Sequence, residues 1–426
     1  MKESSPTAWD EVELGQLAEF RNGVNYTKDN FGTGVRVINV KDFQDYSMPH
    51  YQELSEINPE NVVRPAHLLH ENDIVFVRSN GNKELIGRSM MVRSFPGRPV
   101  THSAFTIRVR FTSTAVDPRF YSYVFRSGLI RQVLSAHGSG TNISNLNQDI
   151  LSRLRVPLPP LPTQRRIASI LSAYDDLIEN NTRRIAIMEE MARRLYDEWF
   201  VQFRFSGHED VPMVDSEIGK VPEGWEVVRL EDVAAFIGRG ISPKYDDEAD
   251  CRVINQKCIR DQRLNMDLSR RQSKNVRENK VVRFGDVLIN STGVGTLGRV
   301  AQVYEPLENT TVDSHVTIAR AEEAIDLDYF GQQLLSLQPH FEGQGVGATG
   351  QTELSRGRVA ETSFIQPPCD LQEQFGDIVR PMKSLCTRLA AKNTNLRTQR
   401  DLLLPKLISG EIDVSEVGEP SEEAAA

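Results

Sequence analysis

The amino-acid sequence contains few cysteines and no long run of apolar residues. Its four cysteines, Cys251, Cys258, Cys369 and Cys386, form no CxxC pair and have no histidine at metal-ligand spacing. This pattern predicts reduced thiols and no metal site. No segment approaches the roughly 18 consecutive apolar residues of a membrane span, and no N-terminal stretch resembles a signal peptide. These absences favour a cytoplasmic protein that does not contact a membrane.

Motifs that would support catalysis are also missing. ATP hydrolysis would need a G-x-x-x-x-G-K-[ST] loop, and the sequence has none. Methyl transfer to a flipped adenine would need an Asn-Pro-Pro-aromatic motif, and the nearest candidate, Asn58-Pro-Glu-Asn61, lacks the second proline and the aromatic residue. Asp73 and Asp286 begin equivalent segments without a Glu-x-Lys partner in both, so we interpret them as structural. We assign no catalytic residue.

The most informative feature that is present is an internal repeat. Trp9 recurs as Trp225, and Arg36 recurs as Arg252, each 216 residues later. Farther along, small deletions shorten this offset. The segments that still match are Asp73-Ile-Val with Asp286-Val-Leu, Gly87-Arg88 with Gly298-Arg299, Thr106-Ile107 with Thr317-Ile318, Asp117-Pro-Arg-Phe-Tyr121 with Asp326-Leu-Asp-Tyr-Phe330, and Pro160-Leu-Pro-Thr-Gln164 with Pro368-Cys-Asp-Leu-Gln372. Each copy is close to the size of a domain, so the repeat predicts two tandem domains.

Short segments with alternating apolar and polar residues recur inside each copy, separated by Gly, Asn and Pro. They are Asp73–Arg78 and Ala104–Phe111 in the first copy, and Asp286–Asn290 and His315–Ala319 in the second. This alternation is typical of half-buried strands. We therefore expect each copy to form a mixed α/β (α+β) domain.

Each copy ends in a long heptad pattern. The seam positions are Ile167, Leu171, Tyr174, Ile178, Asn181, Ile185, Met188, Ala192, Leu195 and Trp199 in the first copy, and Leu371, Phe375, Ile378, Met382, Leu385, Leu389, Lys392, Leu396, Gln399 and Leu403 in the second. Two seams of equal length in one chain are expected to pack on each other. The alternative is that each is an ordinary amphipathic helix lying on its own domain.

Polar residues and a proline interrupt these seams. Asn181 is expected to oppose Lys392 and Gln399, and such polar positions fix helix register. Pro381 should kink the second helix or delay its start, because proline lacks an N–H group and clashes with the preceding turn. About 38 helical residues at about 1.5 Å each would form a rod about 57 Å long.

Charge is distributed unevenly along the chain. The formal net charge is −9, but residues 64–131 hold 11 Lys and Arg against 4 acids, and residues 252–299 hold the same numbers. Acidic residues gather in the 205–250 linker and in the C-terminal tail. Equivalent basic regions interleaved with Asn, Ser, Thr and Gly suit contacts with DNA phosphates and base edges. The alternative is a solvated basic surface.

The loops between the matched segments differ between the copies. Arg78-Ser-Asn-Gly-Asn-Lys83 aligns with Asn290-Ser-Thr-Gly-Val-Gly-Thr296, and Gly138-Ser-Gly-Thr-Asn-Ile-Ser-Asn145 aligns with Gly347-Ala-Thr-Gly-Gln-Thr-Glu-Leu354. Equal frames with unequal polar loops predict two domains that read two different short sequences. The candidate DNA-binding residues are Arg78, Ser79, Asn80, Asn82, Lys83, Arg88, Arg93, Ser139, Thr141 and Asn142 in the first copy, and Lys257, Arg260, Arg263, Asn290, Ser291, Thr292, Arg299, Thr349, Gln351 and Thr352 in the second.

Several motifs occur together in a recognisable order. They are the start Pro222-Glu-Gly-Trp225, the strand Gly285-Asp-Val-Leu-Ile289, the loop Gly138-Ser-Gly-Thr141, the helix entry Pro159-Pro-Leu-Pro-Thr-Gln164, and the helix endings Leu195–Phe205 and Leu403–Ile412. With the tandem repeat, this set resembles the specificity subunits of Type I restriction-modification enzymes over nearly the whole chain. The second helix entry lacks the prolines of the first, so its geometry is expected to differ.

The resemblance implies a non-catalytic subunit that recognises double-stranded DNA. Two target recognition domains would each read one half of a bipartite asymmetric target, and two long antiparallel coiled-coil helices would separate them as a ruler. The helices would bind two methyltransferase subunits, and nuclease subunits would join for cleavage. S-adenosylmethionine, ATP and Mg²⁺ would belong to those partners, so this chain is expected to bind no cofactor. A rod of about 57 Å exceeds one turn of B-DNA, about 34–36 Å, which fits a ruler.

The expected segments follow from the repeat and the helices. They are target recognition domain 1 at 1–160, spacer helix 1 at 161–205, a linker at 206–223, target recognition domain 2 at 224–368, spacer helix 2 at 369–410 and a disordered acidic tail at 411–426. Two other functions remain open from the sequence. One is a coiled-coil scaffold that binds only proteins, and the other is a self-contained methyltransferase or nuclease.

Overall fold

The chain folds into two compact units. The computed structural model describes residues 9–43, 48–93, 97–136, 146–345 and 353–418. Unit 1 comprises Met1–Glu179 with Thr394–Ala426, and unit 2 comprises Asn180–Asn393. The unit boundaries fall inside two long helices, α4 (Leu161–Tyr196) and α8 (Cys369–Ser409). Each unit therefore combines one copy of the repeat with a part of both helices.

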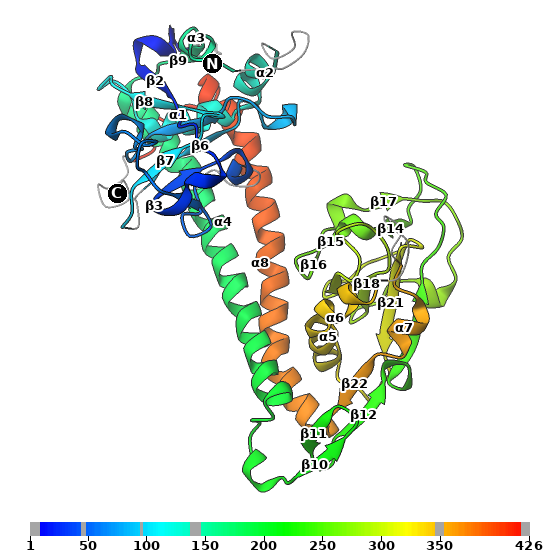
Figure 1. Cartoon of the computed structure of the whole chain (residues 1–426). Helices are drawn as coiled ribbons and strands as arrows, with labels where there is room; N and C mark the ends of the chain where they lie inside the picture. Colours follow the sequence, from blue (N-terminus) through cyan, green and yellow to red (C-terminus); the bar gives the residue numbers. More distant parts are fainter. Residues whose placement is uncertain (1–8, 44–47, 94–96, 137–145, 346–352, 419–426) are drawn as a thin grey trace. The chain divides into compact units, whose positions relative to one another are not determined.

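Unit 1 is a mixed α/β structure (Figure 1). A four-stranded sheet has the order β2-β8-β5-β6, a three-stranded sheet has the order β4-β3-β7, and β1 pairs with β9. The strands are β1 (Glu11–Glu13), β2 (Ala18–Asn22), β3 (Phe31–Ile38), β4 (Ser55–Ile57), β5 (Ile74–Val77), β6 (Ser89–Met91), β7 (Val100–His102), β8 (Thr106–Phe111) and β9 (Arg155–Pro157). The shorter helices are α1 (Pro118–Arg126), α2 (Gly128–Ala136) and α3 (Gln148–Ser152).

Unit 2 repeats this topology. Its sheets have the orders β13-β21-β18-β19, β17-β14-β20 and β12-β22, with an added hairpin of β15 and β16. The strands are β12 (Glu226–Arg229), β13 (Ala234–Arg239), β14 (Arg252–Ile254), β15 (Ile259–Arg260), β16 (Arg263–Leu264), β17 (Arg270–Arg271), β18 (Val287–Asn290), β19 (Val300–Gln302), β20 (Thr310–Val312), β21 (Val316–Ala321) and β22 (Ser363–Gln366). The shorter helices are α5 (Leu327–Ser336), α6 (Gln338–Gly343) and α7 (Arg356–Ala360). The duplicated topology confirms the tandem repeat.

Between the copies, the linker forms a hairpin rather than a featureless segment. Its strands are β10 (Met213–Ser216) and β11 (Gly219–Pro222), and a π-helical turn (Asp197–Val201) extends α4 before it.

Short 3-10 turns occur in both units. They lie at Leu14–Gln16, Lys28–Asn30, Val40–Phe43, Pro65–His67, Lys83–Leu85, His208–Asp210, Leu230–Asp232, Gln256–Cys258, Met266–Leu268 and Glu278–Lys280.

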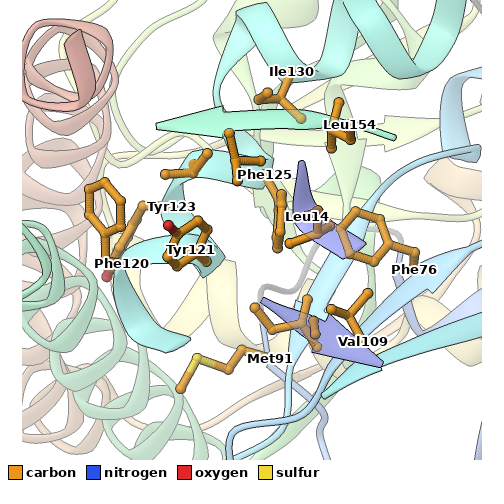
Figure 2. Close-up of a cluster of buried hydrophobic side chains, with 14 of the residues drawn as sticks. Leu14, Phe76, Met91, Val109, Phe120, Tyr121, Tyr123, Phe125, Ile130 and Leu154 are labelled. Atoms are coloured by element: carbon orange, nitrogen blue, oxygen red, sulfur yellow. The ribbon is translucent and has the colours of Figure 1, made fainter. Parts of the chain in front are cut away.

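The central strand β5 explains how one sheet supports two apolar layers. All four of its residues are buried. Ile74 and Phe76 belong to the cluster that contains Leu14, Phe120 and Phe125 (Figure 2). Val75 and Val77 belong to a separate cluster around Phe43. Successive strand side chains point to opposite faces, so a strand that is apolar throughout must be covered on both sides. In unit 2, β18 divides its side chains between two clusters in the same way.

Helices α4 and α8 pair in antiparallel orientation (Figure 1). In unit 1, Asp175 of α4 accepts a hydrogen bond from Arg400 of α8. In unit 2, Asn181 Nδ2 donates to Asn393 Oδ1 at 2.8 Å. The contact partners move backward along α8 as they move forward along α4, which confirms the expected antiparallel pair. No helix among the described residues is long and apolar enough to cross a membrane.

The predicted seam is confirmed on α4 but is displaced by one residue on much of α8. The buried residues of the first seam are Ile167, Leu171, Ile178, Asn181, Ile185 and Ala192. On α8, Lys392 and Gln399 are exposed. The prediction that they oppose Asn181 is wrong, because the neighbouring residue Asn393 occupies that place and is 3% exposed.

Two expectations for the C-terminal part of the chain are corrected. Helix α8 begins at Cys369, so Pro381 does not delay its start. The chain remains ordered beyond Glu411, where disorder was expected, because Val414 is 4% exposed and packs in the apolar core of unit 1 with Leu407. Residues 419–426 lie outside the described residues.

Candidate nucleic-acid interface

In unit 1, two loops and one returning segment meet where β5 ends and β8 begins. The N–H of Arg78, just after β5, donates to the carbonyl of Phe105, just before β8, at 2.8 Å. The carbonyl of Arg78 accepts from the N–H of Leu146 at 2.9 Å. We call the group Arg78, Ser79, Ser103–Phe105 and Leu146 tip 1. These bonds join segments far apart in the sequence through backbone groups, so the frame does not depend on side-chain identity.

Unit 2 builds the same frame at the end of β18. The N–H of Ser291 donates to the carbonyl of His315 at 2.8 Å, and the carbonyl of Ser291 accepts from the N–H of Leu354 at 2.9 Å. We call the group Ser291, Thr292, Asp313–His315 and Leu354 tip 2. Thr292 Oγ1 lies 2.7 Å from His315 Nδ1 and orients the imidazole.

The two frames correct part of the sequence alignment. Val77 pairs with Thr106 in unit 1, and Asn290 pairs with Val316 in unit 2. The match of Thr106-Ile107 with Thr317-Ile318 is therefore wrong by one residue. The structural counterpart of Phe105 is His315, and the counterpart of Arg78 is Ser291 rather than Asn290.

A glycine lies against each tip because the backbone passes too closely for a side chain. A Cβ atom on Gly23 would lie 2.2 Å from the carbonyl oxygen of His102, and one on Gly240 would lie 1.9 Å from that of Val312. Both distances are below any van der Waals contact. The same steric requirement in both copies places the end of β2 beside tip 1 and the end of β13 beside tip 2.

At the far end of these strands, an ion pair is repeated almost atom for atom. Arg110 Nε and Nη2 donate to the two oxygens of Asp73, each at 2.7 Å, and Arg320 donates to Asp286 with the same distances. Both carboxylates are 1% exposed. Charge-assisted bidentate pairs of this kind position backbone and strand ends. The geometry supports the structural interpretation of Asp73 and Asp286.

The polar loop after β5 stabilises itself with its own side chains. Asn80 Oδ1 accepts from the N–H of Asn82 at 2.7 Å, and Asn82 Oδ1 accepts from the N–H of Glu84 at 3.0 Å. Arg78, Ser79 and Asn80 are half-buried, and Asn82 is exposed. Asn and Asp side chains commonly close turns in this way. The structure therefore places four predicted residues together at or beside tip 1.

Three predicted arginines lie in other surroundings. Arg88 donates to the carbonyl of Phe43 at 3.3 Å, Arg93 lies 3.5 Å from Asp176, and Arg299 donates to a carbonyl of its own loop at 2.7 Å. These contacts give each arginine a role inside the fold. The predicted residues that lie outside the described residues are Ser139, Thr141, Asn142, Thr349, Gln351 and Thr352, together with the side chain of Lys83.

Two predicted residues at the end of β18 are buried. Asn290 and Ser291 are both 0% exposed. Asn290 Nδ2 donates to the carbonyl of Gln256 at 3.0 Å, and Ser291 Oγ lies 2.6 Å from Thr317 Oγ1. Their side chains hold tip 2 together from within, so we leave them out of the contact surface.

The three remaining predicted cations lie in or beside the hairpin of β15 and β16 and have different surroundings. Lys257 is exposed and makes no ion pair among the described residues, whereas Arg260 lies 3.5 Å from Asp261. Arg263 donates through Nε to Glu189 of α4 at 2.7 Å. Arg263 thus fastens the hairpin to α4 within unit 2, and the Lys257 side chain is exposed.

Sequence reasoning missed the most exposed side chains of the tips. Phe105 is 60% exposed, and His315 is also exposed. Neither is a cation nor lies in a glycine-rich loop, so charge and loop composition gave no signal for them. Only the correct register, which depends on the backbone bonds of the tips, brings them to equivalent places.

Clustered metal-ligating side chains or a buried histidine can indicate an active site. The described residues contain no group of three or more His, Cys, Asp or Glu that could hold a metal ion. Burial, helped by Arg108 and His67, lowers the pKa of His102 to about 3, so this imidazole is neutral near pH 7. Its Nδ1 lies 2.9 Å from Thr106 Oγ1 inside the sheet. Such a histidine is a core residue.

Comparisons with known proteins agree with the duplicated architecture. The sequence profile of the Type I restriction modification DNA specificity domain matches residues 6–190 and again residues 222–396. The Type I restriction enzyme MjaIX specificity subunit of Methanocaldococcus jannaschii is 23% identical over 425 residues, which cover 97% of this chain and 95% of that protein. The HindI specificity subunit of Haemophilus influenzae is 22% identical over 345 residues, covering 66% and 74% of the two chains.

A solved structure shares the fold. The crystal structure of the Type-I restriction-modification S subunit from M. genitalium superposes with a TM-score of 0.61 at 16% sequence identity. The match covers 96% of this chain and 98% of that chain. At this identity the likeness concerns the fold alone.

Proposed function

Because this chain belongs to the family of Type I restriction-modification DNA specificity domains, we propose that it selects the DNA sequence on which a Type I restriction-modification complex acts. It is a sequence-specific DNA recognition protein without a catalytic site of its own. Each unit reads one half of a bipartite target, because each unit carries one copy of the recognition domain.

The observation that carries this function is the pair of tips. Both rest on the same backbone bonds, with N–H to carbonyl distances of 2.8 and 2.9 Å, yet they present different side chains. A constant frame with variable exposed groups is what reading two unrelated short sequences requires. Exposed cations such as Lys257 supply phosphate contacts that position the protein without reading bases.

The helices are proposed to set the spacing between the two half-sites. Helix α4 has 36 residues and α8 has 41. At about 1.5 Å per residue, α4 alone is about 54 Å long, which exceeds one turn of B-DNA at about 34–36 Å. Half-sites held apart by such helices would leave unread base pairs between them.

The same helices are proposed to assemble the partner proteins. We expect two methyltransferase subunits and, in a cleavage complex, nuclease subunits. S-adenosylmethionine, ATP and Mg²⁺ would be bound by these partners, because the chain has no P-loop or methyltransferase motif to hold them. The complex would work in the cytoplasm, where its DNA target is found.

Long-read detection of methylated bases tests this function. DNA is compared from cells that express the partner methyltransferase with and without this chain. A split asymmetric motif that is methylated only when the chain is present supports the proposal. An unchanged methylation pattern, with the complex shown to assemble, would favour a scaffold that binds only proteins. Methylation or cleavage by the isolated chain would instead favour a self-contained enzyme.

A further inference from the structure

The tips place one exposed residue of each copy at the same structural position. Phe105 follows the turn after β7, and His315 follows the equivalent turn after β20. The carbonyl of Phe105 accepts from the N–H of the residue after β5, and that of His315 accepts from the N–H of the residue after β18, each at 2.8 Å. The turn itself is repeated, because Thr106 N–H donates to Ser103 and Val316 N–H donates to Asp313. The equivalence therefore rests on backbone bonds on both sides of the residue.

The backbone frame does not depend on the side chain at this position, although His315 bonds to its neighbour Thr292. Phe105 is 60% exposed, and the backbone of its turn is held by bonds that any residue could make. Single exposed apolar residues are common on proteins and need no explanation alone. Here, however, the position is exposed in both copies, while the residues that follow it, Thr106 and Val316, are buried. A site open to change without loss of structure suits a residue that determines specificity.

Resting on the proposed function, we propose that Phe105 and His315 are specificity-determining residues that contact base edges in the two half-sites. Phe105 has no polar atom, and the feature of the major groove that it can recognise is the C5 methyl group of thymine. His315 presents Nε2, because Nδ1 is engaged by Thr292 Oγ1 at 2.7 Å. When the threonine hydroxyl donates to Nδ1, Nε2 carries the proton and donates to the N7 atom of a purine.

The two residues thus read different chemistry from one position. The methyl contact depends on apolar surface, and the purine contact depends on a hydrogen bond. Each contact can be removed from the DNA without changing base pairing. Uracil in place of thymine removes the methyl group, and a 7-deazapurine removes N7.

The first experiment maps methylated motifs for complexes assembled with F105A, H315A and F284A chains. Phe284 is the control, because it is a phenylalanine of similar exposure, 50%, near the start of β18 and far along the strand from tip 2. F105A should relax one base pair in one half-site, H315A should relax one base pair in the other, and F284A should leave both unchanged. Unchanged motifs in both F105A and H315A, or changes in the same half-site, would overturn the proposal.

A second experiment measures binding of the assembled complex to its mapped target. Replacing the recognised thymine with uracil should weaken binding of the wild-type complex about fourfold, the effect of one buried methyl group. The F105A complex should lose nothing further from the same replacement. Equal losses in both complexes would refute the methyl contact while leaving the DNA-recognition function intact. Absence of any mapped motif for the wild-type chain would refute the function itself.

Discussion

The buried amide pair between α4 and α8 should be strongly coupled. Asn181 is 2% exposed and Asn393 is 3% exposed, and Asn181 Nδ2 donates to Asn393 Oδ1 at 2.8 Å. Replacing either residue alone with leucine breaks this buried hydrogen bond, which costs about 1–3 kcal/mol. In the Asn181 variant, Asn393 Nδ2 still donates to Thr182 Oγ1 at 3.2 Å. Replacing both with leucine removes the unsatisfied group and extends the apolar seam, so most of that loss should be recovered.

Urea unfolding measures this coupling. Trp199 and Trp225 belong to the core of unit 2, so in a Trp9→Phe background tryptophan fluorescence reports unit 2. Each of N181L and N393L should lower the unfolding free energy of this unit by about 1–3 kcal/mol. The double variant should lie close to wild type, so the coupling energy should equal the sum of the two single losses, about 2–6 kcal/mol.

Additive effects would refute the reasoning. If each single substitution changes the unfolding free energy by less than about 0.5 kcal/mol and the double variant shows their sum, the pair contributes no specific interaction. A matched control is Lys392→Leu, because Lys392 is the exposed neighbour of Asn393 on α8 and lies in unit 2, whose unfolding the fluorescence reports. This control should have little effect on stability.

Three further predictions concern charge, steric fit and DNA contact. Burial alone would raise the pKa of Asp175, but the neighbouring Arg126 and Arg400 lower it. The ionised Asp175 therefore stabilises the fold above the unfolded-state pKa of about 3.9. This stabilisation is lost as the pH falls through the lower folded-state pKa. Thermal unfolding of D175N should therefore show a flatter acid limb than wild type. Gly23→Ala should destabilise unit 1 by about 1–3 kcal/mol in urea unfolding, because of the 2.2 Å approach, whereas Gly81→Ala, with no atom within 4 Å, should not. Lys257→Ala should weaken DNA binding equally for all sequences. In a salt titration of binding, it should also reduce the slope of log affinity against log salt by about one phosphate contact. Arg263→Ala should leave this slope unchanged.

The sequence was sufficient to predict the repeat and the strands because these depend on local patterns. The pattern in Asp73–Arg78 led to β5, but the prediction that this strand is half-buried is wrong, because all four of its residues are buried. The match of Gln164 with Gln372 is confirmed by equivalent bonds. Each glutamine Oε1 accepts from the N–H of an N-terminal helix cap, at 2.9 Å in unit 1 and 3.2 Å in unit 2. Each Nε2 also donates to a proline carbonyl at 2.8 Å.

The sequence was not sufficient to predict register where two neighbouring residues are chemically alike. Ile378 and Val379 are both apolar, so a seam can pass through either, and packing places Val379 in the core while leaving Ile378 41% exposed. The tips raise the same difficulty, because the turns before β8 and β21 set the register through backbone bonds. Phe105 and His315 could not be matched by residue identity, since the structure conserves their position and not their type.

The central claim is that two recognition domains read half-sites at a separation fixed by the helices. The most direct test removes one heptad from each helix, Thr182–Met188 and Cys386–Lys392, which retains the Asn181 and Asn393 pair. Methylated motifs are then mapped for the assembled complex. Seven residues correspond to about 10 Å, so the gap should shorten by about 3 base pairs while both half-sites stay the same. Changed half-sites with an unchanged gap would contradict the account.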